Sequence, residues 1–202
     1  MTASRRSSRQ GRTGSGVDTK RVERAVRELL LAVGEDPQRE GLRDTPCRVA
    51  RMYQELFSGL GQDPAQEIKV YHAKNEDELI LVRDISFYSI CEHHLLPFFG
   101  QVHIAYIPRD NKVTGFSSLV RVVETMSRRL QLQERLTADI ADTLMARLRP
   151  LGLLVVVEAE HLCLTMRGVK KPGSRVVTSA IRGGMKREST RLEALSLIKG
   201  RP

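Results

Sequence analysis

Tryptophan is absent from this chain, and large aromatic residues are scarce. Five Phe and four Tyr are the only such residues among 202. Proteins that hold single-stranded nucleic acid stack bases on aromatic side chains, so a chain with few of them is poorly equipped for that task. Nucleic-acid binding is therefore a weak interpretation, although the net charge is +9.

Long apolar runs and a disulfide framework are also missing. No stretch approaches the roughly 18 consecutive apolar residues of a membrane span, and the N-terminus has no apolar run typical of a secretory signal. Three cysteines, an odd number, argue against a disulfide framework and favour a reducing compartment. We therefore expect a cytoplasmic protein without a membrane partner, long enough to bury a real core.

Basic residues are concentrated near the two ends of the chain. Residues 1–16 carry four Arg and no acid, and residues 167–202 carry ten Lys or Arg against two Glu. The middle, residues 17–166, holds 19 basic and 22 acidic residues. A basic excess gathered in this way suits an anionic small molecule such as a polyphosphate at least as well as a duplex.

Composition divides the chain into three parts. Residues 1–16 are rich in Ser, Arg and Gly and predict a disordered basic tail. Residues 17–65 contain two helical patterns, one starting at Asp18 and one at Asp44. Residues 66–202, the predicted catalytic domain, begin where Ile, Val, Phe and Tyr become frequent.

The third part alternates between strand and helix patterns. Strands are predicted over 68–72, 79–90, 99–107, 153–158 and 175–181, and helices over 117–130, 133–148 and 190–198. Along the chain, helices come first, then strands, then a helix pair and then strands again. This order predicts an α+β domain with an antiparallel sheet.

The strongest chemical signal lies in two short segments. Cys91 and His94 stand three residues apart, which is a local spacing of zinc ligands, and Cys163 follows some seventy residues later. A catalytic zinc site leaves its fourth position to water, whereas a structural site fills it with a protein ligand. His93 or His161 could be that ligand, so spacing alone leaves the choice open.

The two remaining histidines of these segments have other interpretations. His93 would point away from His94 on a regular strand, so it needs a turn or a separate task such as proton transfer. His161 and Cys163 would share a face if both stood on the strand that starts at residue 153. Each histidine alone is more simply a hydrogen-bonded core residue, but two Cys and three His gathered in this way favour a metal site. His72 and His103 match no motif, and Cys47 is predicted to be a packing residue.

Two other zinc proteins are excluded by pattern. Nucleic-acid deaminases need a C-x-x-C pair, which this sequence lacks. A zinc finger needs four ligands on one small unit, and Cys91 and Cys163 lie too far apart for that.

Four separated motifs, in order, resemble type I GTP cyclohydrolase. They are Glu40-Gly41-Leu42-Arg43-Asp44-Thr45-Pro46, the segment from Phe87 to Gly100 (FYSICEHHLLPFFG), Gln131-Leu132-Gln133-Glu134-Arg135-Leu136-Thr137, and Glu160-His161-Leu162-Cys163-Leu164-Thr165-Met166-Arg167-Gly168. The resemblance covers about residues 18–199.

The resemblance implies a fold, an assembly and a reaction. The fold is the tunnelling fold, in which an antiparallel sheet carries a helix pair on one face and subunits pool their strands into a large barrel. The assembly is a homodecamer of two pentamers with active sites at subunit interfaces. The reaction hydrolyses the imidazole ring of GTP, releases formate and yields 7,8-dihydroneopterin triphosphate, the first intermediate toward folate or tetrahydrobiopterin.

The same resemblance implies roles for individual residues. The zinc ligands match Cys91, His94 and Cys163, with water at the fourth position. The acid and base groups match His161, at the purine N7, and His93, while Ser117 matches a serine near the ribose. Guanine recognition matches Glu134 with Gln133 beside it, and triphosphate binding matches Arg121 and Arg167.

One position departs from the family pattern. Ser118 stands where the family usually has a lysine that contacts phosphate. Losing one charge-assisted contact costs about 1.5–3 kcal/mol if nothing replaces it. Either a neighbouring basic residue compensates, or the enzyme binds GTP more weakly, or the chain is a paralogue that acts on a related guanine nucleotide. Two further alternatives are a non-catalytic protein in which zinc braces an assembly, and a nucleic-acid binder that uses its two basic ends.

Overall fold

The computed structural model describes residues 16–74 and 77–200, and these fall into two compact units that meet within one helix. The first unit reaches to Gln54 and the second runs from Glu55. The predicted disordered tail, residues 1–16, lies outside the described residues except for Gly16.

The first unit contains the two helices that the sequence predicts. Helix α1 covers Thr19–Ala32, and the side chain of Asp18 caps it by accepting a hydrogen bond from the Arg21 N–H at 3.0 Å. Helix α2 covers Thr45–Leu56, so its last turn belongs to the second unit. Cys47 is exposed on α2, so its predicted role as a packing residue is wrong within this chain.

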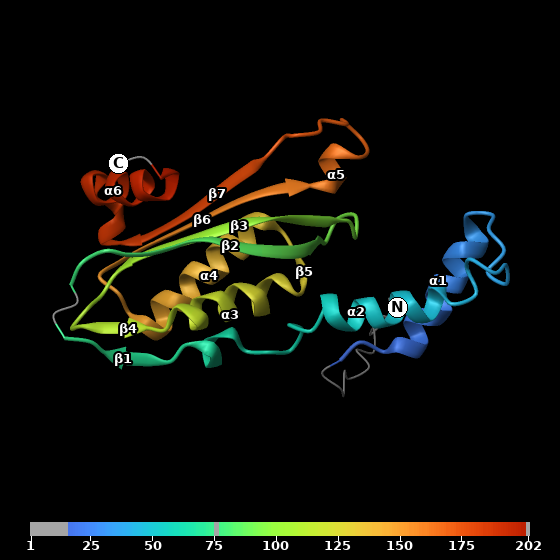
Figure 1. The fold of residues 1–202 in the computed structure, drawn as a ribbon, viewed down its shortest axis with the longest axis horizontal. Helices are drawn as coiled ribbons and strands as arrows, with labels where there is room; N and C mark the ends of the chain where they lie inside the picture. The colour runs from blue at the N-terminus through green and yellow to red at the C-terminus, as the bar shows by residue number, and fades with distance from the viewer. Residues whose placement is uncertain (1–15, 75–76, 201–202) are drawn as a thin grey trace, which may run out of the picture. The chain divides into compact units, whose positions relative to one another are not determined.

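The second unit is built on a five-stranded sheet, drawn in Figure 1 as the long central layer. Its strands lie in the order β5 (Leu130–Gln131), β2 (Ile80–Cys91), β3 (Pro97–Ile107), β6 (Gly152–His161) and β7 (Val176–Gly183). A separate two-stranded sheet pairs β1 (Val70–His72) with β4 (Lys112–Thr114). The α+β class predicted from the sequence is confirmed.

The sheet differs from the prediction at one edge. Four strands are antiparallel, but β5 pairs in parallel with the end of β2, with Ile90 opposite Leu130 and Cys91 opposite Gln131. The sequence suggested a helix to Leu130, whereas α3 covers Phe116–Ser127. Two residues of strand are too short to show the alternation that marks a strand in sequence.

Helices cover the two faces of the sheet unequally. Helices α3 and α4 (Gln133–Leu148) lie against one face, and their buried apolar side chains form the main core with those of β2, β3 and β6 (Figure 1). Helix α6 (Glu188–Lys199) packs against part of the other face, where Ala194 joins a smaller cluster with Ala105, Leu154 and Met185. Short helical turns complete the unit: η1 (Pro64–Glu67), α5 (Leu162–Thr165) and η2 (Gly184–Lys186).

Glycine lets two strands approach closely in the middle of the sheet. Gly100 of β3 pairs with Ala159 of β6, and a Cβ atom at Gly100 would lie 2.0 Å from the carbonyl oxygen of Glu158. No side chain fits there, so the two strands can approach this closely only with glycine at this position.

Candidate metal centre and active site

A tight turn after β2 arranges the first pair of candidate ligands. The strand ends at Cys91, and the chain turns over residues 92–95. The Leu95 N–H donates to the Cys91 carbonyl, and the Cys91 N–H donates to the Leu96 carbonyl, both at 2.9 Å. Leu95 takes a φ of 54°, which reverses the chain. His93 and His94 therefore stand on a turn, where strand alternation does not apply, and their rings are 6.2 Å apart and nearly perpendicular.

Strand register brings the third ligand to the same place. Ile90 pairs with Pro97, and Phe98 pairs with His161, so the end of β6 lies beside the turn that follows β2. The strand stops at His161, and Cys163 stands on the single helical turn α5. The expectation that His161 and Cys163 share a strand face is therefore wrong. The β-branched run ends at Val157, and the residues after it carry no strand signal strong enough to oppose a turn.

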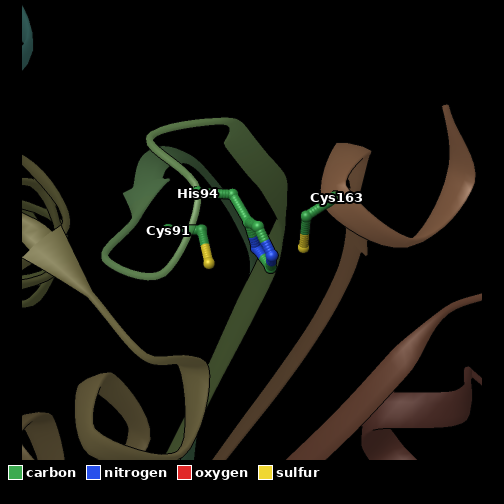
Figure 2. A group of neighbouring side chains, drawn as sticks. All are labelled: Cys91, His94 and Cys163. Atoms are coloured by element: carbon green, nitrogen blue, oxygen red, sulfur yellow. The ribbon is translucent and has the colours of Figure 1, made fainter. Parts of the chain in front are cut away.

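Three ligand atoms converge on one point. The two Sγ atoms of Cys91 and Cys163 and a ring nitrogen of His94 lie within 4.8 Å of one another, and Figure 2 shows the three side chains turned toward a common centre. Ligand atoms at about 2.0–2.3 Å from a tetrahedral ion are roughly 3.5–3.8 Å apart, so a small contraction would close the set. Cys91 is buried, Cys163 half-buried and His94 exposed, so one side of the centre is open.

The chemistry of this set suits a soft divalent cation. Burial raises the pKa of the Cys163 thiol, and the neighbouring Cys91 sulfur raises it further. A cation between the two sulfurs removes this penalty, because it takes the place of the protons and supplies compensating charge. Two thiols and one imidazole are the donors that zinc prefers.

The other two histidines stand outside this group. Among the described residues, neither His93 nor His161 places a ring nitrogen within 4.8 Å of all three ligand atoms. A set of three protein ligands with an open side is the arrangement of catalytic sites, whereas structural zinc sites have four.

His161 is held in place by two neighbours. Its ring stacks on Phe98, with centroids 4.6 Å apart and planes 7° from parallel. Its Nε2 atom lies 2.6 Å from Oε1 of Gln133. Burial lowers the pKa of His161, and the negative charge of Glu134 opposes that shift. The ring therefore has one orientation, and burial favours its neutral form.

Gln133 and Glu134 begin α4 but face different surroundings. The Gln133 side chain is 1% exposed and is fully engaged within the protein. Glu134 is exposed and lines an open groove of about 370 Å³ between α4 and β7. Of Gln133 and Glu134, only Glu134 lines that groove.

The positions expected to contact the ribose and the triphosphate lie on α3 and in the segment after α5. Ser117 and Arg121 are exposed, and so is Arg167. Arg121 donates from Nε to a carboxylate oxygen of Glu67 at 2.8 Å, and its Nη2 atom lies 3.5 Å from Oγ of Ser118. The residue that replaces the usual lysine is thus buried and in contact with the neighbouring arginine.

One ion pair of the site has no signal in the sequence. Arg135 of α4 makes a two-pronged contact with Glu92, with N···O distances of 2.7 and 3.2 Å. The contact lowers the pKa of Glu92 and raises that of Arg135. The pair ties the turn between Cys91 and His94 to α4. The two residues are 43 positions apart, so only the folded chain shows that they meet.

Fold and site together define an α+β protein with an open Cys-His-Cys group that could hold a metal ion, and a fixed histidine beside the third residue of that group. No helix in the described part of the chain is both long and apolar enough to cross a bilayer.

Sequence comparison gives the family. Residues 22–199 match the GTP cyclohydrolase I family. The chain is 60% identical to GTP cyclohydrolase 1 of Pelotomaculum thermopropionicum over 91% of its own length and 98% of that protein. It is also 60% identical to the GTP cyclohydrolase 1 of Carboxydothermus hydrogenoformans, over 90% of this chain and 95% of that protein. It is 59% identical to the GTP cyclohydrolase 1 of Geobacillus sp., over 91% of this chain and 98% of that protein. The chain belongs to the GTP cyclohydrolase I family.

Proposed function

We propose that this protein hydrolyses GTP, opens the imidazole ring of the guanine base, releases carbon 8 as formate and yields 7,8-dihydroneopterin triphosphate. The observation that carries the proposal is the convergence of Cys91, His94 and Cys163 in a chain 60% identical to proteins named GTP cyclohydrolase 1. All the residues to which we assign a role lie in the unit that begins at Glu55.

Zinc is the metal that this donor set favours. Cys91, His94 and Cys163 would hold it. Bound there, zinc would supply Lewis-acid activation of a water molecule at neutral pH. Two thiolates cancel much of the charge of a divalent ion, so neighbouring groups that move protons are needed as well.

His161 and His93 are our candidates for those groups. In this proposal His161 donates a proton to N7 of the purine, which makes carbon 8 more electrophilic, and His93 serves as the second acid and base during ring opening. His161 is half-buried beside Cys163 and held by Phe98 and Gln133. His93 is exposed on the turn between the two ligands Cys91 and His94.

Glu134 is the group that would select guanine. Its carboxylate can accept hydrogen bonds from N1 and from the exocyclic amine. Adenine has no donor at N1, so it would leave the carboxylate partly unpaired, which is the kind of mismatch that gives strong discrimination. Any contact of Gln133 with the base is left to its backbone, because its side-chain amide is occupied within the protein.

Arg121 and Arg167 would bind the triphosphate, with Ser117 near the ribose. Guanidinium groups suit phosphate oxygens because they donate two parallel hydrogen bonds. Arg121 lies against Ser118, so it occupies the neighbourhood of the missing lysine. Its ion pair with Glu67 would have to open or adapt when phosphate binds.

The assembly that we propose is a tunnelling-fold barrel, in a homodecamer made of two pentamers. Both edges of the five-stranded sheet support it. Strand β7 is the last strand on one side, and on the other side β5 pairs with β2 only at Ile90 and Cys91, among the described residues. Tyr88 of β2, outside the part that β5 covers, and Val177 of β7 are exposed apolar residues. Free edges of this kind pair with further strands.

Incubation of the zinc-loaded protein with GTP tests the activity. We expect one formate per GTP consumed and a fluorescent pterin after oxidation. The proposal fails if protein carrying one zinc per chain releases no formate.

Two alternatives are separated by further measurements. Equal turnover of GTP, GDP and GMP would contradict triphosphate recognition and favour a paralogue with another guanine nucleotide as substrate. If the metal only braces the assembly, we expect no turnover of any nucleotide. Wild type and His161→Ala should then have the same zinc content and the same stability.

A further inference from the structure

The contact between Gln133 and His161 carries information about which ring nitrogen holds a proton. Nε2 of His161 and Oε1 of Gln133 are 2.6 Å apart. A distance alone does not say which atom donates, because an imidazole nitrogen can do either. The other contacts of Gln133 decide the matter.

The amide of Gln133 can stand in only one orientation. Its Nε2 atom donates to the backbone carbonyls of Val157 and Val176, each at 3.0 Å, and lies 3.1 Å from the hydroxyl of Thr178. Carbonyl oxygens only accept, so the NH₂ group must face them. Turning the amide over would set its oxygen against two buried carbonyls and leave them without this donor.

Oε1 of Gln133 is therefore the atom that faces His161, and it can only accept. Nε2 of His161 must be the donor and must carry a hydrogen. This holds for the neutral ring and for the imidazolium alike, because both can keep a proton on Nε2.

The second ring nitrogen is left for other chemistry. Phe98 fixes the plane of the ring by stacking at 4.6 Å. Nδ1 of His161 has no hydrogen-bond partner among residues 16–74 and 77–200, and it is not among their enclosed, unpaired polar atoms. Nδ1 is thus accessible to solvent or to a bound molecule.

We infer that Gln133 is a positioning residue that keeps a proton on Nε2 of His161, so that Nδ1 is the nitrogen that exchanges a proton with the substrate. The inference rests on the proposed function for the identity of the substrate, but the tautomer follows from the hydrogen bonds alone.

Before the transfer, the neutral ring takes up a proton from solvent at Nδ1, so that the imidazolium of His161 has a proton on each nitrogen. Nδ1 gives its proton to N7 of the purine, the N–H bond at Nδ1 breaks, and a new N–H bond forms at N7. The ring becomes neutral with its remaining proton on Nε2, where Oε1 of Gln133 already accepts it. No proton has to cross from one ring nitrogen to the other during the step.

Nitrogen-15 solid-state NMR of the zinc-loaded protein tests the tautomer directly. The chain has only five histidines, so comparison with His161→Ala assigns the His161 signals. At pH 8.5, where an imidazole is neutral, we expect a protonated Nε2 and an unprotonated Nδ1. The reverse assignment would overturn the inference whether or not the protein turns over GTP. A correct tautomer in protein that releases no formate would instead sink the proposed function alone.

One substitution of Gln133 tests the consequence for turnover. Gln133→Met has a similar volume but no acceptor, so we expect mixed tautomers and kcat lower by roughly 10- to 100-fold, the range seen when a hydrogen-bond partner that orients a metal-bound histidine is lost, with KM for GTP changed less than twofold.

Ser127→Ala is the matched control. It also removes a buried side-chain hydrogen bond to a backbone carbonyl in the same unit, from Oγ of Ser127 to Glu124 at 3.1 Å. We expect it to lower the unfolding temperature without changing kcat. A folded Gln133→Met protein with the wild-type kcat, or with the wild-type tautomer of His161, would overturn the positioning role.

Discussion

At the scale of single residues, the thiols of Cys91 and Cys163 illustrate how a site can be unfavourable until a ligand arrives. Burial raises the pKa of the Cys163 thiol, and the neighbouring Cys91 sulfur raises it further. Metal binding reverses the sign of both effects, because the ion needs the deprotonated form. The pair is therefore expected to hold metal tightly and to release protons when it does so.

Loss of one thiol should abolish metal binding. We expect Cys163→Ser to lower zinc from one per chain to near zero, since a hydroxyl is a much poorer zinc ligand than a thiolate. Cys47→Ser is the control, because Cys47 is exposed and belongs to the other unit. Elemental analysis after gel filtration measures both. Full zinc content in Cys163→Ser would show that the ion is held elsewhere.

His103 should make stability depend on pH. It is buried, its Nδ1 accepts a hydrogen bond from the Asp84 N–H at 3.1 Å, and burial lowers its pKa although the carboxylate of Asp84 lies 3.9 Å away. His103 has a higher pKa in the unfolded chain than in the folded chain, so its protonation favours unfolding. The contribution of neutral His103 to folding stability is therefore complete above about pH 6.5 and is lost as the pH falls below that value.

Urea unfolding of the wild type and of His103→Gln, at pH 7.5 and 5.5, measures this effect. Glutamine can still accept from the Asp84 N–H but does not titrate. We expect the wild type to lose more free energy of unfolding than the variant over this range. An equal loss in the two proteins would show that other groups are responsible.

At the scale of secondary-structure elements, strand register and one short turn build the site. The pairs between Ile90 and Pro97 and between Phe98 and His161 set the ends of three strands side by side. The ion pair of Arg135 with Glu92 then ties the turn to α4. Both residues of this pair are at the surface, so its contribution is to geometry more than to stability.

Gly100→Ala should disturb the sheet near the site. The added methyl group would meet the Glu158 carbonyl oxygen and the Cα of Ala159, which are backbone atoms that cannot turn aside. Overpacking of this kind costs about 1–3 kcal/mol or more. Gly115→Ala is the control, since the nearest atom to its Cβ would be 3.7 Å away and its φ is −63°. Chemical denaturation compares the two, and similar stability would contradict close packing at Gly100.

At the scale of the whole molecule, the question is what covers the two sheet edges. A single chain leaves most of the outer edge of β2 and the outer edge of β7 without strand partners, among the described residues. Proteins usually protect such edges by pairing or by charge. Tyr88 and Val177 provide no charge, which favours pairing with another chain.

Native mass should reveal the proposed assembly. We expect the wild type to sediment with about ten times the mass of one chain. Replacing both Tyr88 and Val177 by lysine should lower the native mass, because charge at edges opposes pairing. Leu192→Lys changes an equally exposed apolar residue on α6 and should not. A wild type that sediments as a single chain would exclude the barrel.

Elements with a regular pattern were predictable from sequence. Helix α4 was expected over residues 133–148 and covers Gln133–Leu148, and α1 begins beside its predicted cap, Asp18. The two-residue strand β5 and the helical turn that carries Cys163 were missed. Both are shorter than one repeat of the pattern that would reveal them.

The amino-acid sequence by itself determined the family, the donor types and the α+β class, because ligand chemistry and hydrophobic periodicity are written along the chain. Only the tertiary structure decided that Gln133 turns away from the groove and toward His161, and that Glu92 meets Arg135. These contacts join residues 28 and 43 positions apart. The orientation of the Gln133 amide depends on which backbone carbonyls need a donor. That is a property of packing in three dimensions, and no local pattern records it.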